Sequence, residues 1–338
     1  MMKKYLTIAL IAAFFAATAF GAEGLKVLNK IKIGGTGGWD YVALDNTNRR
    51  LYVSHGTIVE VVDPDAGKVV GQITGLHGVH GIAVAPELNK GFITNGQSNS
   101  VTVFDLKTLA KTGEPAAGKN PDAVCYEPKT KRVFAMNHTG NDATAIDAKT
   151  LEIVATFPLG PAPEFCVVDG AGKVYVNLEG SSEILEIDAA KPAVTRRVSL
   201  APAEGPSGLA IDVKGKKLFA VCGGSKSMAV VDIPTFKVVA TPAIGSGTDA
   251  AGYDPGTGLA FSSNGDGTLS VIKQSGGKYE TVDTVTTVRG ARTMTVDEKT
   301  HRVYLLAAEY GPAPDAKDGK KGRPPVLPDS FGVLVVGK

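Results

Sequence analysis

The stretch Asn120–Gly160 reads NPDAVCYEPKTKRVFAMNHTGNDATAIDAKTLEIVATFPLG and decides the fold. It contains four short apolar or alternating runs, at Ala123–Tyr126, Arg132–Met136, Ala143–Ile146 and Ile153–Phe157. Each run is bounded by Pro, Gly, Asn or Lys-Thr residues, which is typical of short antiparallel strands joined by hairpin turns. A four-stranded sheet of about 40 residues is too small to bury both of its faces alone. The stretch therefore needs similar neighbours.

Such neighbours recur at a fixed spacing. The turn after the first strand returns every 40 to 43 residues, at Asp45, Ala85, Glu127, Asp169, Asp212, Asp254 and Asp297. An aromatic residue follows in each second strand, at Tyr52, Phe92, Phe134, Tyr175, Phe219, Phe261 and Tyr304. An Asp closes the third strand in five copies, at Asp63, Asp105, Asp147, Asp188 and Asp232, whereas the sixth copy has Lys273. This period is typical of propeller blades, and no window shows the 3.6-residue apolar period of helical repeats. The sequence predicts an all-β fold, a seven-bladed β-propeller of four-stranded antiparallel blades.

The seventh copy lacks a fourth strand. Its first three strands are expected at Arg292–Val296, Val303–Ala307 and Phe331–Val336, after which the sequence ends. Leu25–Ile33 alternates as a strand should and stands ahead of the first copy. We expect it to join Phe331–Val336 as the outer strand of blade seven, which would close the ring and remove an open sheet edge.

Residues 22–338 are expected to form one propeller domain, because no interdomain linker interrupts the copies. The segment Gly311–Asp329 is rich in Pro, Gly and charged residues and cannot form a packed core of its own. Its place between the second and third strands of the seventh copy predicts a surface loop. The loop is either a lid or decoration.

The first 21 residues have the pattern of a secretion signal peptide. Lys3 and Lys4 precede the apolar run Leu6–Ala17, and small residues up to Gly21 offer a cleavage site. The alternative is a transmembrane anchor, but the apolar run is short for that and rich in Ala. We therefore expect a periplasmic or secreted protein that has no membrane anchor after cleavage, and a monomer.

The charge balance is close to neutral. Without Lys3 and Lys4 the chain has 34 basic and 34 acidic residues, and it has no Lys/Arg-rich run. Nucleic acid and anionic membranes are therefore disfavoured as partners.

The three cysteines are an odd number without CxxC spacing, so at most one disulfide can form within the chain. Cys125 and Cys166 lie in the first strands of adjacent copies but one position out of register. We expect their faces to differ, and we interpret Cys125, Cys166 and Cys222 as buried free thiols.

Tetrapeptides in the second strands resemble a known family. Phe92-Ile93-Thr94-Asn95 nearly spells YVTN, and related forms are Leu51–Ser54, Phe134–Asn137 and Val174–Asn177. With the run NSVTVFDLKT over Asn99–Thr108, the chain resembles the YncE-like, YVTN-repeat seven-bladed propellers over roughly residues 25–338. The resemblance implies an exported bacterial protein with binding roles, and some relatives are linked to DNA. The later copies depart from the motif, and no catalytic set carries over, because this fold hosts unrelated activities.

A ring of polar residues is predicted at one mouth of the central channel. The position five residues before each first-strand turn is ionisable in six copies of seven, and the positions two and four residues later are mostly apolar. The ring reads Asp40, His80, Asp122, Glu164, Ser207, Asp249 and Arg292. Loops between second and third strands should open at the same end and add His55 and His138. Trp39 precedes the ring and either packs under the rim or stacks on a ligand.

Asp40, His80, Asp122 and Glu164 are candidate ligands of a divalent cation. Carboxylates with one imidazole suit Ca²⁺, Mg²⁺ or Mn²⁺ better than a structural Zn²⁺. Alternatively, the mouth is only a wet rim in which Arg292 neutralises Asp249 and Asp40.

Two classes of function remain open. The first is an exported binding or scaffold protein that recognises a small ligand or a protein partner at the mouth. The second is a metal-dependent hydrolase, lactonase or lyase that uses the same carboxylate–His cluster. A single-stranded nucleic-acid binder is a third alternative. Motifs for phosphate loops, nucleophile elbows and HExxH metal sites are absent from the sequence.

Overall fold

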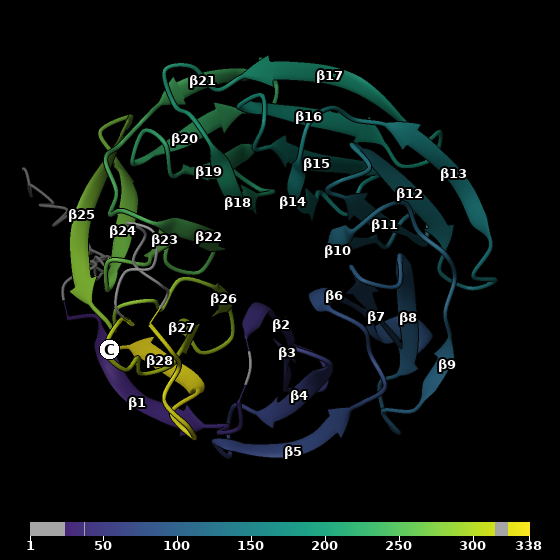
Figure 1. Cartoon of the computed structure of the whole chain (residues 1–338). Coiled ribbons are helices and arrows are strands. Elements are labelled where there is room, and N and C mark those ends of the chain that lie inside the picture. Colours follow the sequence, from purple (N-terminus) through teal and green to yellow (C-terminus); the bar gives the residue numbers. More distant parts are fainter. Residues whose placement is uncertain (1–23, 37, 315–323) are drawn as a thin grey trace, which may run out of the picture.

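Seven four-stranded sheets surround a central channel like the blades of a propeller (Figure 1). The computed structural model describes residues 24–36, 38–314 and 324–338. The expected signal peptide therefore lies outside the described residues, and so does the middle of the insertion. In the described part, the regular structure is antiparallel β-sheet apart from one 3-10 turn, η1 (Pro86–Leu88). None of its helices is long and apolar enough to span a bilayer. The predicted fold is confirmed.

In blades one to six the chain runs from the channel outward. Blade one comprises β2 (Trp39–Asp45), β3 (Arg50–His55), β4 (Ile58–Asp63) and β5 (Lys68–Ile73). Blade two comprises β6 (Val79–Ala85), β7 (Lys90–Asn95), β8 (Ser100–Asp105) and β9 (Lys111–Gly113). Blade three comprises β10 (Pro121–Glu127), β11 (Arg132–Asn137), β12 (Asp142–Asp147) and β13 (Ile153–Pro158). Blade four comprises β14 (Pro163–Val168), β15 (Lys173–Leu178), β16 (Glu183–Asp188) and β17 (Ala193–Ser199).

The last three blades complete the ring. Blade five comprises β18 (Pro206–Asp212), β19 (Lys217–Cys222), β20 (Ser227–Asp232) and β21 (Lys237–Ala240). Blade six comprises β22 (Thr248–Asp254), β23 (Leu259–Asn264), β24 (Thr268–Ser275) and β25 (Lys278–Thr286). Blade seven comprises β26 (Met294–Asp297), β27 (Arg302–Ala307), β28 (Gly332–Gly337) and β1 (Lys26–Lys32).

Blade seven closes the ring as expected. β1 pairs antiparallel with β28, with Lys30 opposite Leu334, so that the first strand of the chain is the outer strand of the last blade. An ion pair also joins blade seven to blade one, because Arg49 Nη2 of blade one lies 2.7 Å from Asp297 Oδ2 of blade seven, whose side chain is fully buried. The closure thus combines a strand ladder with a charge-assisted hydrogen bond.

The described ends of the insertion lie between β27 and β28, where the sequence places the loop. They pair with one another, because the Gly311 N–H donates to the Pro325 carbonyl and the Leu327 N–H donates to the Glu309 carbonyl, each over 2.8 Å. The stem of the insertion is therefore an extension of this hairpin.

The Asp that closes the third strand in five blades has a local structural role. Asp147 Oδ1 accepts hydrogen bonds from the N–H groups of Lys149 and Thr150, over 2.8 and 2.9 Å. The backbone N–H of Thr150 is the main cause that lowers the pKa of Asp147. Such an Asx turn satisfies backbone donors that the end of the strand would leave without partners.

The hydrophobic core is divided among the seams between blades. The aromatic side chain of every second strand is almost fully buried, at Tyr52, Phe92, Phe134, Tyr175, Phe219, Phe261 and Tyr304. Phe134, for example, packs with Val174 and Val176 of the next blade. Burying one such ring stabilises the folded state by roughly 1.5–3 kcal/mol. These seven aromatic side chains therefore account for much of the packing energy between neighbouring blades.

A β-bulge in the innermost strand of each of blades one to six positions the polar ring. In blades one to six the register between the first and second strands shifts at the ring residue, as between Pro121 and Val124 in blade three. A bulge leaves backbone groups unpaired and re-aims a side chain. Polar residues of the YVTN-like tetrapeptides bond these groups: Ser54 accepts the Asp40 N–H and Thr94 accepts the Gly81 N–H.

Candidate functional site

Five side chains at the mouth alternate between acid and imidazole. His80 Nδ1 lies 2.6 Å from Asp40 Oδ2 and 3.6 Å from Asp122 Oδ1. His138 Nδ1 lies 3.0 Å from Glu164 Oε2 and 4.0 Å from Asp122 Oδ2. We call this series, Asp40–His80–Asp122–His138–Glu164, the acid–imidazole chain. Asp122 is its centre, because it faces both imidazoles.

Four consecutive blades supply the acid–imidazole chain. Asp40, His80, Asp122 and Glu164 stand at the bulges of β2, β6, β10 and β14, as their common spacing predicts. His138 comes from the hairpin after β11, and its N–H donates to the Asn120 carbonyl over 2.9 Å. The expectation that these hairpins open at the same mouth is confirmed for His138.

The acid–imidazole chain retains protons that isolated acids would lose. Asp122 is 14 % exposed, and burial, together with the charges of Asp40 and Glu164, raises its pKa to about 8. Its Oδ1 accepts no hydrogen bond within the described part of the chain. Burial also raises the pKa of Glu164, and the contact with Glu164 raises the pKa of His138. Burial alone would lower the pKa of His80, but Asp40 and the other acids raise it overall.

The other half of the ring is neutralised internally. Asp249 Oδ2 accepts a hydrogen bond from Thr293 Oγ1 over 2.8 Å, and Arg292 Nη1 lies 3.8 Å from its Oδ1. Ser207 Oγ donates to the Thr248 carbonyl. Burial raises the pKa of Asp249. Arg292 thus pairs with Asp249, and no described ion pair joins it to Asp40.

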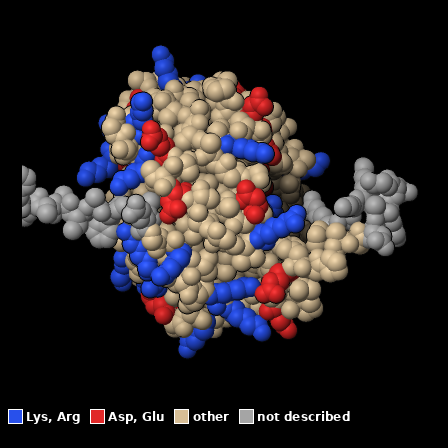
Figure 2. Space-filling model, turned by 90° about the vertical axis from the view of Figure 1, so that its left-hand side faces the viewer, with Lys and Arg blue, Asp and Glu red and all other residues tan. Residues whose placement is uncertain are grey.

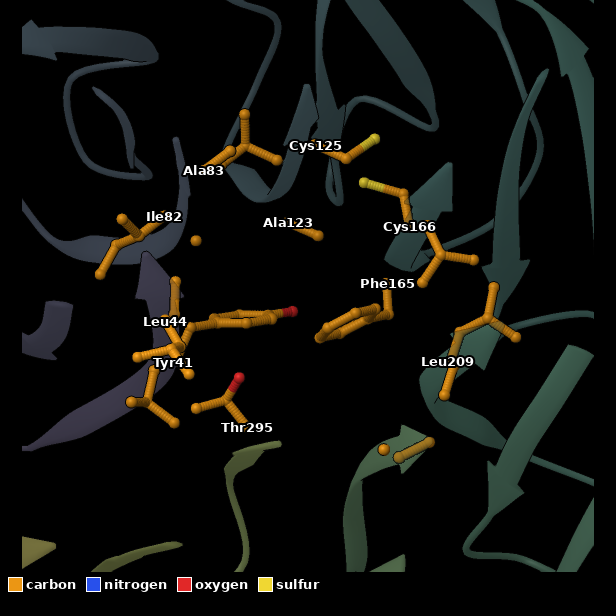
Figure 3. A pocket seen from close by; sticks show the side chains of 18 of the residues that line it. Tyr41, Leu44, Ile82, Ala83, Ala123, Cys125, Phe165, Cys166, Leu209 and Thr295 are labelled. Atoms are coloured by element: carbon orange, nitrogen blue, oxygen red, sulfur yellow. The ribbon is translucent and has the colours of Figure 1, made fainter. Parts of the chain in front are cut away.

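Two aromatic rings form a floor beneath the mouth. Tyr41 and Phe165, which directly follow ring residues, stack with centroids 5.5 Å apart, and Tyr41 OH donates to the Glu164 carbonyl over 3.1 Å. Both rings line a space of about 20 Å³ at the mouth and a cavity of about 420 Å³ farther along the channel (Figure 3). The smaller space suits one water molecule or ion. We did not predict this floor, although its two aromatics adjoin predicted ring positions.

The structure does not bring His55 and Trp39 into the acid–imidazole chain. His55 is 4 % exposed, packs against Phe331 with ring centroids 4.7 Å apart, and has Nδ1 3.5 Å from Glu60. It ends β3 opposite Trp39, which also stacks on Phe331 at 4.7 Å. Both side chains therefore pack at the seam between blades seven and one. For Trp39, this is the packing under the rim that the sequence offered as one of two possibilities.

Two overlapping groups of three side chains could each hold a metal ion. They are Asp40, His80 and Asp122, and Asp122, His138 and Glu164, and within each group the ligand atoms lie within 4.8 Å of one another. Both groups share Asp122. Of the four predicted metal ligands, the structure places three in the first group and two in the second, and it adds His138.

Comparisons with known proteins agree with the architecture. The chain is 26% identical to the uncharacterized protein YncE of Salmonella typhi over 170 residues, which are 47% of this chain and 46% of that protein. It is 40% identical to antigen Lp49 of Leptospira interrogans over 77 residues, 22% of this chain and 17% of that protein. The chain therefore matches less than half the length of these curated relatives.

A solved chain of the Kuenenia stuttgartiensis hydrazine synthase superposes with a TM-score of 0.68 at 16% identity, covering 87% of this chain and 96% of that one. At this identity the likeness shows the fold alone. No family model matches the sequence.

The fold and its mouth define a class, the seven-bladed β-propellers, and together with these relatives they support a binding or scaffold role. Within that class the chain is similar to YncE over 47% of its length. Its ligand must be argued from the mouth.

Proposed function

We propose that the protein is an exported binding protein whose mouth holds a divalent cation and, through it, recognises a small ligand or a protein partner. Export rests on the signal-peptide pattern of residues 1–21. The observation that carries the cation is the sharing of Asp122 by two groups of potential ligands.

The protonation of the acid–imidazole chain supports a cation. Asp122 tends to retain its proton, because burial and then the charges of Asp40 and Glu164 raise its pKa to about 8. A bound cation would replace these protons and offset the repulsion between carboxylates. Its affinity should therefore increase with pH.

The ligand set favours Mn²⁺ among the three candidate cations. Ca²⁺ and Mg²⁺ prefer sites made wholly of oxygen, whereas each group here offers one imidazole with two carboxylates. A cation held by three side chains keeps positions for water or for an oxygen of a ligand. This open side provides the recognition element of the proposal.

The charge on one side of the molecule shows no footprint for nucleic acid. Figure 2 shows basic and acidic side chains spread over the side of the molecule that carries β25 and β1, with wide uncharged areas between them. Nucleic-acid binding generally requires a basic patch or stripe.

The test is the melting temperature of chelator-treated protein titrated with Mn²⁺, Mg²⁺ and Ca²⁺. Binding to the folded state alone stabilises it by about 2.7 kcal/mol at a hundredfold excess over Kd. We expect Mn²⁺ to give the largest rise, and Asp122→Asn combined with Glu164→Gln to abolish it.

Asp249→Asn is the matched control, because it alters a ring carboxylate outside both groups, and it should keep the rise. If wild type and double variant melt alike with and without each metal, the mouth is only a solvated rim.

A further inference from the structure

Two cysteines from neighbouring blades face one another. Cys125 lies on β10 and Cys166 on β14, and both are buried, at 8% and 5% exposed. Figure 3 shows their sulfur atoms pointing toward one another at the wall of the 420 Å³ cavity, which both residues line. Both cysteines belong to one core cluster between blades three and four.

The register of the two strands explains why the thiols meet. Val124, opposite Ala135, and Cys166, opposite Val176, occupy equivalent positions after the bulges of their blades. Val124 packs toward blade two, and Cys125, one residue later, packs toward blade four in the same cluster as Cys166.

Cys125 and Cys166 thus lie on different faces of their strands, as expected, and meet because they face one another across the seam between blades three and four. Adjacent blades pack with opposite faces against each other, so a one-residue offset brings the two side chains together. The expectation of buried free thiols agrees with the structure.

Cys222 shows what an isolated thiol looks like in this fold. It is fully buried in blade five, and its Sγ lies 3.5 Å from the Ala220 carbonyl oxygen. It belongs to a different core cluster from the other two cysteines and does not line the cavity. It is an internal control for thiol oxidation.

We propose that Cys125 and Cys166 form a redox site, in which a hydroperoxide oxidises the two thiols to a disulfide that links blades three and four. One thiolate attacks the peroxide, the O–O bond breaks, and a sulfenic acid forms while the departing oxygen takes up a proton as water. The second thiol then attacks that sulfur, the S–S bond forms, and a second water leaves. The thiols lose two electrons and two protons, and hydrogen peroxide becomes two water molecules. An added dithiol reverses the change by exchange.

The surroundings of the pair determine its rate. The thiolate is the attacking nucleophile, and a buried thiol reacts only where the oxidant can reach it. The cavity offers a small peroxide access that the interior of blade five does not. This proposal is independent of cation binding.

The disulfide would tie together two strands that carry mouth residues. Asp122 lies three residues before Cys125 on β10, and Glu164 lies two residues before Cys166 on β14. The link would therefore fix the spacing of the two blades beneath His138.

The experiment treats the reduced, folded protein with hydrogen peroxide. After quenching, unfolding and alkylation with iodoacetamide, tryptic peptides are read by mass spectrometry. We expect peptide 120–129 linked to peptide 150–173, with the mass of two hydrogens lost, and released by dithiothreitol. Peptide 218–226, which carries Cys222, should be recovered alkylated.

Two results would overturn the proposal. One is full alkylation of Cys125 and Cys166 after peroxide treatment, and the other is oxidation of each cysteine to its own sulfinic acid without a linked peptide. Any link to Cys222 also counts against it, because that link requires unfolding. Cys125→Ser should abolish the linked peptide, but the decisive measurement uses the wild-type protein and does not depend on the folding of a variant.

Discussion

Blade three carries one carboxylate at each end, and the surroundings of the two carboxylates shift their pKa values in opposite directions. At the turn end, Asp147 accepts two backbone N–H groups, and these hydrogen bonds lower its pKa. At the mouth, Asp122 has an oxygen without a hydrogen bond, and burial with nearby acids raises its pKa to about 8. The Asp at the turn end recurs in five blades, whereas the mouth position changes from blade to blade. The turn end thus specifies the fold, and the mouth carries features that stability alone does not explain.

The two ends should respond to pH with opposite signs. Asp147 has a folded pKa below its unfolded value, so its stabilising contribution is present above the unfolded pKa near 3.8 and is lost as pH falls. Asp122 has a folded pKa of about 8, so the folded state binds the proton more tightly and stability decreases as pH rises from about 4 to about 8. His80 and His138, whose pKa values are raised, likewise stabilise below pH 6.5 and lose that contribution as pH rises. High pH should therefore reduce the contribution of the mouth residues to folding stability, and low pH should reduce the contribution of Asp147.

The largest effect is expected at the turn end of the closing seam. Arg49→Ala leaves the fully buried Asp297 without its cation, and breaking such a pair costs about 3 kcal/mol. Urea unfolding at pH 7 measures the loss. Arg50→Ala, which removes a half-exposed pair with Asp63, is the control and should cost less than about 1 kcal/mol. Equal losses in the two variants would contradict a special role of the seam.

A smaller effect of opposite sign is expected at the mouth. In chelated protein, Asp122→Asn should raise stability near pH 8, because the variant lacks the buried carboxyl group whose ionisation the folded state resists. Unfolding free energies measured from pH 5 to pH 9 should decrease in the wild type and remain flatter in the variant. A parallel pair of curves would show that Asp122 ionises normally.

The smallest effect is expected from a single turn. Asp147→Ala removes two backbone hydrogen bonds at an exposed hairpin and should destabilise the protein by about 1 kcal/mol at pH 7. The difference should shrink as pH falls below about 4, where the wild-type carboxylate also becomes protonated. Thermal unfolding at pH 7 and pH 3.5 provides the comparison, and a difference that grows with acid would refute the sign derived above.

The periodic features of the molecule were predictable from the sequence. The Asp and aromatic columns repeat at a constant spacing because each serves a contact within one blade or between neighbours, and they led directly to seven blades and to the ring. His138 was predictable as well, since hairpins after second strands open at the mouth.

The contacts that the sequence could not reveal depend on which face of an innermost strand meets which blade. The bulge determines the face to which each side chain of the strand points, and a shift of one residue moves a side chain to the opposite face. Cys125 and Cys166 were expected on different faces, and the sequence did not show that these faces meet; His55 was expected at the mouth but packs inside a seam. The floor of Tyr41 and Phe165 likewise depends on how two strands converge across the channel.

The pairing of β1 with β28 also imposes an order on how the molecule is made. Each of blades one to six consists of four consecutive strands, so all of its strands are available as soon as that copy has been synthesised. The seventh cannot be completed until the strand opposite Lys30 has emerged some 300 residues later. Distant pairing of this kind slows folding, although its entropic cost grows only slowly with the length of chain enclosed. During translation, β1 therefore remains unpaired until β28 has been synthesised. A product truncated before residue 332 lacks β28, so its β1 stays unpaired and favours aggregation or degradation.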